Sequence, residues 1–141
     1  MDNDMKRSII LDNYQDARNR GIPEDDNYIR INSNNQSCID NIDIYVKLSG
    51  DVIEDIKYEG EACVIAISST SILSDMLIGK TIDEAKSIIE NYNNMIEEKE
   101  YDESKLGEAI VYNDVYKQPS RKNCATLFVR GMNRVINKEQ E

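Results

Sequence analysis

The sequence predicts an α+β fold, in which a small antiparallel three-stranded sheet has helices packed on one side. Two observations predict it. Apolar residues alternate with polar ones from Ile42 to Leu48, the period of a strand with one buried face, whereas from Ile67 onward they recur at helical spacing. The 141 residues are the length of one domain. We therefore expect residues 1–141 to form a single domain with a polar tail at about 137–141.

The N-terminal part of the chain is predicted to be a helix followed by a surface loop. Residues 6–20 have a helical period and end at Gly21, a typical C-terminal stop. Four residues share one face of this helix, namely Ile9, Ile10, Tyr14 and Ala17. Residues 23–37 begin with proline and are rich in Asn, Asp and Ser, which predicts a long loop.

Three strands are expected in the middle of the chain. Residues 40–48 form the first, and the turn at 49–51 joins it to a second strand at 52–59 in a hairpin. Gly60 interrupts the pattern, and residues 62–66 are expected to form the third strand. A meander is the simplest arrangement of the three.

Helical patterns follow the strands. Helices are expected over residues 67–78, 82–96, 106–112 and 120–136. The second of them begins at a capping box, in which Thr81 accepts from the third amide of the helix and Glu84 reaches back to the Thr81 amide. The charged residues 97–105 are expected to be exposed.

The charge balance excludes several classes of partner. Lys and Arg number 17 against 27 Asp and Glu, so the formal net charge is −10. Nucleic acids and anionic membranes require basic surfaces, so we expect neither as a partner. The chain has no apolar run of membrane-spanning length, and its N-terminus is acidic and lacks the apolar segment of a signal peptide. We expect a cytoplasmic protein.

The available chemistry is narrow because the chain has no histidine and three cysteines. The absence of histidine removes the usual general base and the imidazole metal ligands. An odd number of cysteines in a cytosolic chain makes a disulfide framework a poor interpretation. Thiols, carboxylates, lysine, arginine and tyrosine remain.

The cysteines lie at the ends of predicted elements, where functional groups are often presented. Cys38 precedes a strand, Cys63 lies between strand and helix, and Cys124 lies near the start of the last helix. Asp40 is two residues from Cys38, so both side chains point the same way on an extended segment. Together the four residues supply a Cys₃Asp set for a tetrahedral ion such as Zn²⁺ or iron. Because no close CxxC pair is present, buried structural cysteines remain the alternative.

Cys124 has a second notable feature in its neighbours. Its expected place in the first turn of a helix, beside Arg121 and Lys122, favours the thiolate form. The alternative interpretation is that these two basic residues are only part of a solvent-exposed helix start.

Four segments together match the motifs of one family. They are Tyr14 through Arg18-Asn19-Arg20-Gly21; Asn35-Gln36-Ser37-Cys38-Ile39-Asp40; Gly60-Glu61-Ala62-Cys63 continuing to Ser69-Thr70-Ser71 and Gly79-Lys80-Thr81; and Arg121-Lys122-Asn123-Cys124-Ala125-Thr126-Leu127. Over nearly its whole length the chain resembles the U-type iron–sulfur cluster assembly proteins (IscU/SufU). The long interval between Cys63 and Cys124, and Asn123 where IscU proteins have a histidine ligand, favour the zinc-binding SufU branch.

The resemblance implies a fold, a metal site and a partner. It implies zinc bound by Cys38, Asp40, Cys63 and Cys124 in an α+β domain. It also implies that Cys38 accepts persulfide sulfur from a SufS-type cysteine desulfurase, whose histidine replaces Cys38 on the metal, and that Arg121 supports this transfer. Sulfur would then pass to downstream iron–sulfur assembly or acceptor proteins. Such a protein is a sulfurtransferase-type accessory to the desulfurase rather than a stand-alone enzyme.

The chain departs from the family pattern at five positions. Asn13 replaces a histidine, Ala17 and Gln36 replace prolines, and Ile39 and Ala62 replace glycines beside the ligands. A β-branched residue such as Ile39 does not adopt positive φ easily, so the spacing of Cys38 and Asp40 depends on whether that glycine was needed for its backbone. All four expected ligands are retained.

Three functional hypotheses follow. The first is a zinc-bound sulfur acceptor that works with a desulfurase. The second is a scaffold on which a [2Fe–2S] or [4Fe–4S] cluster is assembled by the same thiolates. The third is a small domain whose cysteines are only structural.

Overall fold

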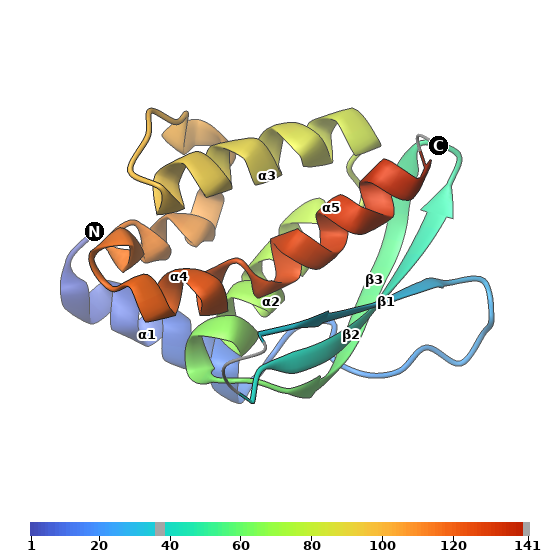
Figure 1. The fold of residues 1–141 in the computed structure, drawn as a ribbon, viewed down its shortest axis with the longest axis horizontal. Coiled ribbons are helices and arrows are strands. Elements are labelled where there is room, and N and C mark those ends of the chain that lie inside the picture. Colours follow the sequence, from blue (N-terminus) through green and yellow to red (C-terminus); the bar gives the residue numbers. More distant parts are fainter. Residues whose placement is uncertain (36–38, 140–141) are drawn as a thin grey trace.

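A three-stranded antiparallel sheet forms one layer of the fold (Figure 1). The structure is a computed structural model that describes residues 1–35 and 39–139, with side chains described up to residue 137. The strands are β1 (Ile29–Asn34), β2 (Asn41–Ser49) and β3 (Val52–Glu61), and they lie in the order β1-β2-β3. The predicted fold class is confirmed.

The helices cover one face of this sheet. Three β2 residues on the covered face are almost inaccessible, namely Ile42, Ile44 and Val46. They alternate with more exposed polar residues, as the period of two predicts. Helices α2 (Val64–Leu77) and α5 (Leu127–Glu139) pack against the sheet (Figure 1). The approach of α5 is so close that a Cβ on Gly131 would lie 2.5 Å from Ile44 Cδ1.

The strand β1 lies where the sequence predicts a loop, so that prediction is wrong for part of residues 23–37. Ile31 of β1 pairs with Ile44 of β2, and the Ser33 hydroxyl donates a 2.6 Å hydrogen bond to the Leu127 carbonyl of α5. The polar composition of this segment favours a loop when it is read alone. The strand forms because its hydrogen-bond partners come from other parts of the chain. Side-chain hydrogen bonds among asparagines also satisfy its exposed face.

The third strand expected at residues 62–66 is also wrong, because α2 begins there. Cys63 is the N-cap of α2, with extended backbone angles of φ −68° and ψ 171°. Its sulfur accepts from the N–H of Ala66 at 3.4 Å, which satisfies one of the unpaired amides of the first turn. In a sequence, a short apolar run fits either a strand or a helix. Here the cap at Cys63 begins a helix.

The remaining helices follow the predicted order with shifted ends. They are α1 (Asn3–Gln15), α3 (Ile82–Ile96) and α4 (Pro119–Ala125), with the 3₁₀ turns η1 (Glu103–Lys105), η2 (Gly107–Tyr112) and η3 (Val115–Lys117). The capping box of Thr81 and Glu84 at the start of α3 is confirmed. Helix α1 begins and ends earlier than predicted, since its N-cap is Asp2, whose side chain accepts from the Met5 amide.

The single helix predicted at residues 120–136 is two helices. Thr126 separates α4 from α5, and its hydroxyl donates to the Lys122 carbonyl at 2.8 Å. A threonine that bonds back to the preceding turn competes with the regular helix ladder and bends the helix. Helix α5 then continues to Glu139, so the polar tail expected from residue 137 is helical over its first part.

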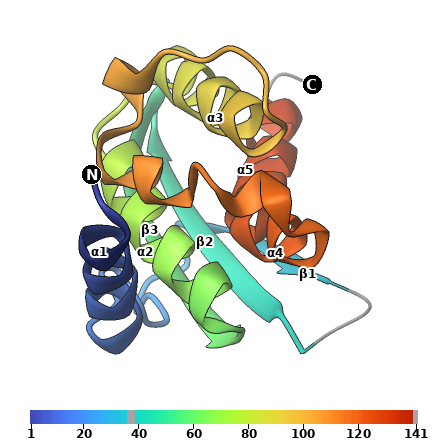
Figure 2. The same cartoon turned by 90° about the vertical axis from the view of Figure 1, so that its left-hand side faces the viewer.

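The helices form a continuous apolar core with the covered sheet face. Figure 2 shows α1 beside α2 and α3 beside α5, and both pairs are in contact. Within the described part of the chain, no helix combines the length and apolar character needed to cross a membrane.

Candidate metal centre

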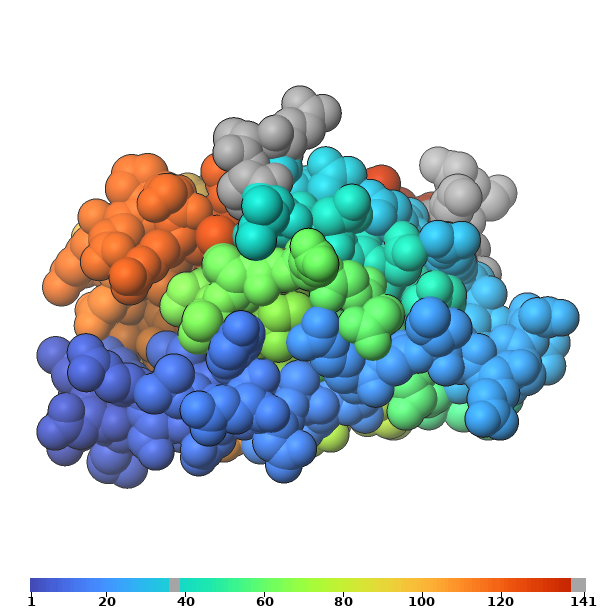
Figure 3. Space-filling model, turned by 90° about the horizontal axis from the view of Figure 1, so that it is seen from below, coloured from blue at the N-terminus to red at the C-terminus, as the bar shows by residue number. Residues whose placement is uncertain are grey.

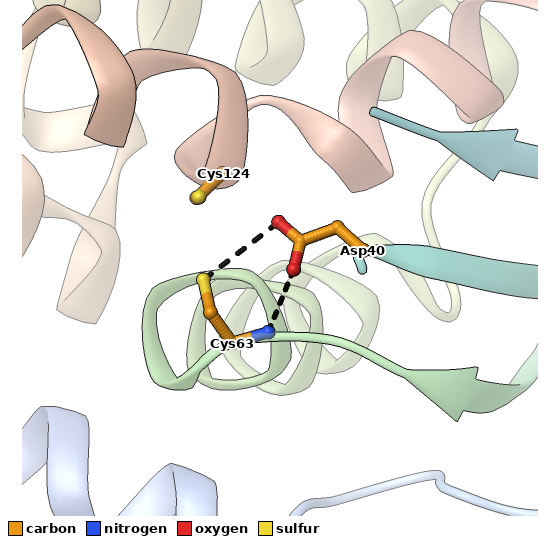
Figure 4. Close-up of side chains that lie close together, drawn as sticks. All are labelled: Asp40, Cys63 and Cys124. Atoms are coloured by element: carbon orange, nitrogen blue, oxygen red, sulfur yellow. Dashed lines mark hydrogen bonds between the residues drawn. The ribbon is translucent and has the colours of Figure 1, made fainter. Parts of the chain in front are cut away.

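Three side chains from distant segments meet at one point. Asp40 directly precedes β2, Cys63 caps α2, and Cys124 lies on α4. One ligand atom of each lies within 4.8 Å of the others. Figure 4 shows the carboxylate and the two thiols directed toward one another. The fold thus gathers three of the four residues that the sequence predicts as ligands.

Asp40 is a buried carboxylate fixed by hydrogen bonds. Asp40 is only 1% exposed. One carboxylate oxygen accepts the Cys63 amide at 2.8 Å, and the other accepts the side-chain amide of Asn35 at 3.1 Å. The second oxygen also lies 3.7 Å from Cys63 Sγ. A buried carboxylate is costly unless it is hydrogen-bonded, and these contacts also fix the direction of its oxygens in the site.

Cys63 presents its sulfur at the N-terminus of a long helix. The partial positive charge there, together with the hydrogen bond from Ala66, favours a negatively charged sulfur ligand. The sequence predicts this helix effect for Cys124, and the structure gives it to Cys63 instead. Cys124 lies at the C-terminal end of α4, so the expectation that it begins a helix is wrong.

The electrostatics of Cys124 favour a cation at the cluster. Burial raises the pKa of the Cys124 thiol, and the nearby Cys63 and Asp40 raise that pKa further. Three acidic groups this close cannot all be ionised without a compensating charge. A divalent cation supplies that charge and removes the cause of the raised pKa.

The donor set and its spacing fit zinc. With Zn–S distances of about 2.3 Å and Zn–O of about 2.0–2.2 Å, a tetrahedral site separates sulfur from oxygen ligands by about 3.5 Å. The 3.7 Å between Cys63 Sγ and Asp40 is close to that edge. Thiolates with one carboxylate suit zinc or the iron of a cluster better than magnesium or calcium, which prefer oxygen ligands.

The remaining two predicted site residues are Cys38 and Arg121. Cys38 falls outside the described residues, while its neighbour Ile39 is 73% exposed. Arg121 is exposed on α4 and lines a groove between α1 and the start of α2, together with Lys6 and Ile65. The segments around this groove are the blue, green and orange surfaces in Figure 3. Arg121 is therefore near the cluster but outside the set of three.

Two residues near the cluster were not predicted as site residues. Asn35, which bonds Asp40, also accepts a hydrogen bond from the guanidinium of Arg130, which lies on α5. Both residues bind the carbonyl of Asn123, next to Cys124. Asn35 stands in one of the quoted motifs and could have been found there, whereas Arg130 gives no signal in the sequence.

Two of the departures from the family pattern, Ala62 and Asn13, are accommodated locally. The described non-glycine residues with positive φ are Asn19 and Glu98, so Ala62 has an ordinary backbone conformation. Asn13, at the place of a family histidine, is buried and accepts a hydrogen bond from the Ser71 hydroxyl at 2.8 Å. It connects α1 to α2 and has a structural role.

Comparison with known proteins supports the same interpretation. Residues 5–125 match the NifU-like N terminal domain family. The chain is 38% identical over 135 residues to the zinc-dependent sulfurtransferase SufU of Bacillus subtilis, covering 95% of this chain and 90% of that protein. It is 31% identical over 134 residues to the iron–sulfur cluster assembly scaffold protein IscU of Thermotoga maritima, covering 95% and 94%.

A solved structure agrees with the fold. The crystal structure of a protein from Fervidobacterium islandicum, described as an iron–sulfur cluster assembly scaffold for the SUF system, superposes with a TM-score of 0.78. It is 32% identical, with 89% of this chain and 91% of that chain covered. The fold, the thiol–carboxylate cluster and these relatives place the chain in the class of iron–sulfur cluster assembly proteins. The chain belongs to the NifU-like N-terminal domain family, and the resemblance found in the sequence is confirmed.

Proposed function

We propose that the protein binds zinc through Cys38, Asp40, Cys63 and Cys124 and accepts persulfide sulfur on Cys38 from a cysteine desulfurase. The observation that carries the proposal is the meeting of Asp40, Cys63 and Cys124 ligand atoms within 4.8 Å. Cys38 is proposed as the fourth ligand because it is a cysteine only two residues before Asp40. The B. subtilis relative, named a zinc-dependent sulfurtransferase, supports the choice of metal and reaction.

The proposed transfer is a thiol exchange. The Cys38 thiolate attacks the terminal sulfur of the desulfurase persulfide, a new S–S bond forms on Cys38, and the desulfurase cysteine leaves as a thiolate. No oxidant or reductant is consumed, because one S–S bond replaces another. Bound zinc would keep the thiols deprotonated and unreactive until the partner docks. Arg121, exposed beside the groove, is proposed to support the transfer to Cys38, and downstream iron–sulfur assembly or acceptor proteins are proposed to take the sulfur.

A second candidate function uses the same residues. The T. maritima relative is named a cluster assembly scaffold, and three thiolates with a carboxylate can also hold the iron of a [2Fe–2S] or [4Fe–4S] cluster. This candidate differs in what the purified protein carries and in what it passes to an acceptor.

Elemental analysis of the purified protein tests the proposal. We expect about one zinc per chain in the wild type, and loss of zinc in Asp40→Ala and Cys124→Ser. Asp43→Ala is the matched control. Asp43 is an aspartate three residues after Asp40, on β2, and it pairs with Arg30 on the solvent face. It should keep its zinc.

A desulfurase assay then tests the reaction. Zinc-loaded wild type should stimulate a SufS-type desulfurase, and Cys38→Ser should not. Iron with matching sulfide in the purified protein would favour the scaffold, and a metal-free wild type would refute both candidates.

A further inference from the structure

We propose that Arg130 is a positioning residue of the metal centre, which acts on the Asp40 carboxylate through Asn35 and directly on the turn of α4 that carries Cys124. This inference rests on the proposed zinc site. It concerns a residue 90 positions away in the sequence from Asp40, on a helix that supplies none of the proposed ligands.

The amide of Asn35 has only one orientation that satisfies its surroundings. Its NH₂ group faces two acceptors, the Asp40 carboxylate at 3.1 Å and the Asn123 carbonyl at 3.2 Å. Its oxygen faces the guanidinium of Arg130. Turning the amide over would place an oxygen against two oxygens and an NH₂ group against a cation. Arg130 therefore fixes which end of Asn35 meets Asp40.

Arg130 also holds the other side of the cluster. It donates to the Asn123 carbonyl at 2.7 Å, so that carbonyl accepts from both Asn35 and Arg130. Asn123 immediately precedes Cys124 near the end of the short helix α4. The two donors connect the last turn of this helix to α5 and to Asn35, which directly follows β1, and they limit its movement relative to Asp40.

The arrangement matches the role that outer hydrogen bonds have at metal sites. Groups that bond a ligand fix its direction, and their removal commonly lowers metal affinity by about 10–100-fold. Asn35 is 7% exposed, so water competes poorly for its bonds. Arg130 is exposed, so replacing it should leave the core unchanged.

The helix provides a matched control one turn further on. Arg134 is also exposed and also on α5, and it donates to the Asn32 carbonyl of β1, close to the Asn35 that Arg130 contacts. Asn32 lies on the solvent side of β1 and bonds Asn41 and Asp43 rather than Asp40. Arg134→Met thus removes the same charge and a similar helix–strand contact without touching the network around Asp40.

The experiment compares zinc affinity, by chelator competition, in wild type, Arg130→Met, Arg130→Lys and Arg134→Met. We expect Arg130→Met to weaken zinc binding by about tenfold or more, and Arg134→Met by less than about threefold. Arg130→Lys keeps the charge but has no planar fork, so it should restore affinity only in part. If Arg130→Lys bound zinc as tightly as wild type, the effect of Arg130 would be one of charge alone, and the positioning role would be overturned.

Two further readouts separate positioning from general stability. The thermal midpoint of the metal-free protein should be the same in Arg130→Met and Arg134→Met, while the absorption bands of the cobalt-substituted site should shift only in Arg130→Met. In the double variant with Asn35→Ala, the loss in affinity should be smaller than the sum of the single losses, because both act along one path.

The outcomes distinguish this inference from the proposed function. If wild type binds zinc and Arg130→Met binds it as tightly as Arg134→Met does, the positioning role is refuted and the metal site stands. If wild type binds no zinc or other metal, the proposed site fails and the inference fails with it.

Discussion

Asp40 and Cys63 are joined at two points. One Asp40 oxygen accepts the Cys63 backbone amide at 2.8 Å, and the other lies 3.7 Å from the Cys63 sulfur. The first contact needs no particular side chain at residue 63, whereas the second needs the thiol. The site thus has a backbone contact that persists without metal and a thiol contact that a metal can replace.

This division predicts different results for two substitutions of Cys63. Serine is a good N-cap and alanine is a poor one, so metal-free Cys63→Ala should have a free energy of unfolding about 1 kcal/mol lower than Cys63→Ser. Both should lose zinc, because neither supplies a thiolate. Urea unfolding with chelator present and elemental analysis measure the two effects. Equal stability of the two variants would show that the cap contributes nothing to α2.

The sequence predicts those strands and helices whose burial has a simple period. The alternation from Ile42 to Val46 and the capping box at Thr81 and Glu84 are local patterns with one interpretation, and both are confirmed. The strand β1 also alternates between more and less exposed residues, but only Ile29 and Ile31 of its six residues are apolar, a run too short to predict a strand. It is held by distant groups, including the Leu127 carbonyl that accepts from Ser33, and no local rule contains that contact.

The candidate site shows the same limit. Its ligands could be predicted because thiols are rare in the chain and because four motifs match a known family. The direction of each ligand could not, since it depends on contacts such as that of Asn35 with Arg130, which are 95 positions apart. The helix position of Cys124 was mispredicted for a related reason, because one threonine divides the last helix.

Asn13 offers a test of the contact between α1 and α2. Asn13→Ala leaves the buried Ser71 hydroxyl without its acceptor and removes the bond to the Ile9 carbonyl, so it should lower the free energy of unfolding by about 1–3 kcal/mol. The exposed neighbour Asp12 is the control, and Asp12→Ala should change stability by less than about 0.5 kcal/mol. Urea denaturation measures both. A cost for Asn13→Ala no larger than that of Asp12→Ala would show that this contact does not hold the helices together.

Gly60 and Gly50 form a matched pair for backbone strain. Both have positive φ, +146° and +62°, but a Cβ on Gly60 would lie 2.2 Å from the Asn41 carbonyl oxygen, whereas one on Gly50 meets nothing within 4 Å. Gly50→Ala should therefore cost only the left-handed backbone, about 1–2 kcal/mol. Gly60→Ala should cost clearly more, because β2 and β3 must separate beside Asp40.

The same Gly60→Ala variant should also lose zinc affinity, since Asn41 directly follows the ligand Asp40. Comparing urea midpoints and zinc content of the two alanine variants measures this. Equal destabilisation would indicate that β3 adjusts to the added carbon without disturbing β2.

The ion pair of Lys6 and Asp114 is expected to make the free energy of unfolding depend on pH in the acidic range. The hydrogen bond from Lys6, which is 3.0 Å away, lowers the pKa of Asp114 below its usual range, although partial burial opposes the shift. A carboxyl whose pKa is lower in the folded state stabilises the fold above its unfolded pKa of about 3.9, and that contribution is lost as the pH falls through the folded pKa.

Lys6→Met removes this partner of Asp114 while keeping a long side chain. The variant should be less stable than wild type at pH 7, by less than about 1 kcal/mol because Asp114 is half exposed. The difference should shrink as the pH falls below the unfolded pKa of about 3.9 and Asp114 becomes protonated in both proteins, down to the part contributed by the hydrogen bond from Lys6 to the Asn113 side chain. Lys86→Met, which removes a lysine of α3 that takes no part in this ion pair, should show a difference that does not change over the same range. Urea unfolding of the metal-free proteins between pH 2.5 and 7, at about 50 mM salt, measures these differences. A difference between Lys6→Met and wild type that stays constant with pH would mean that Lys6 stabilises the fold through its 2.6 Å hydrogen bond to the Asn113 side chain rather than through Asp114.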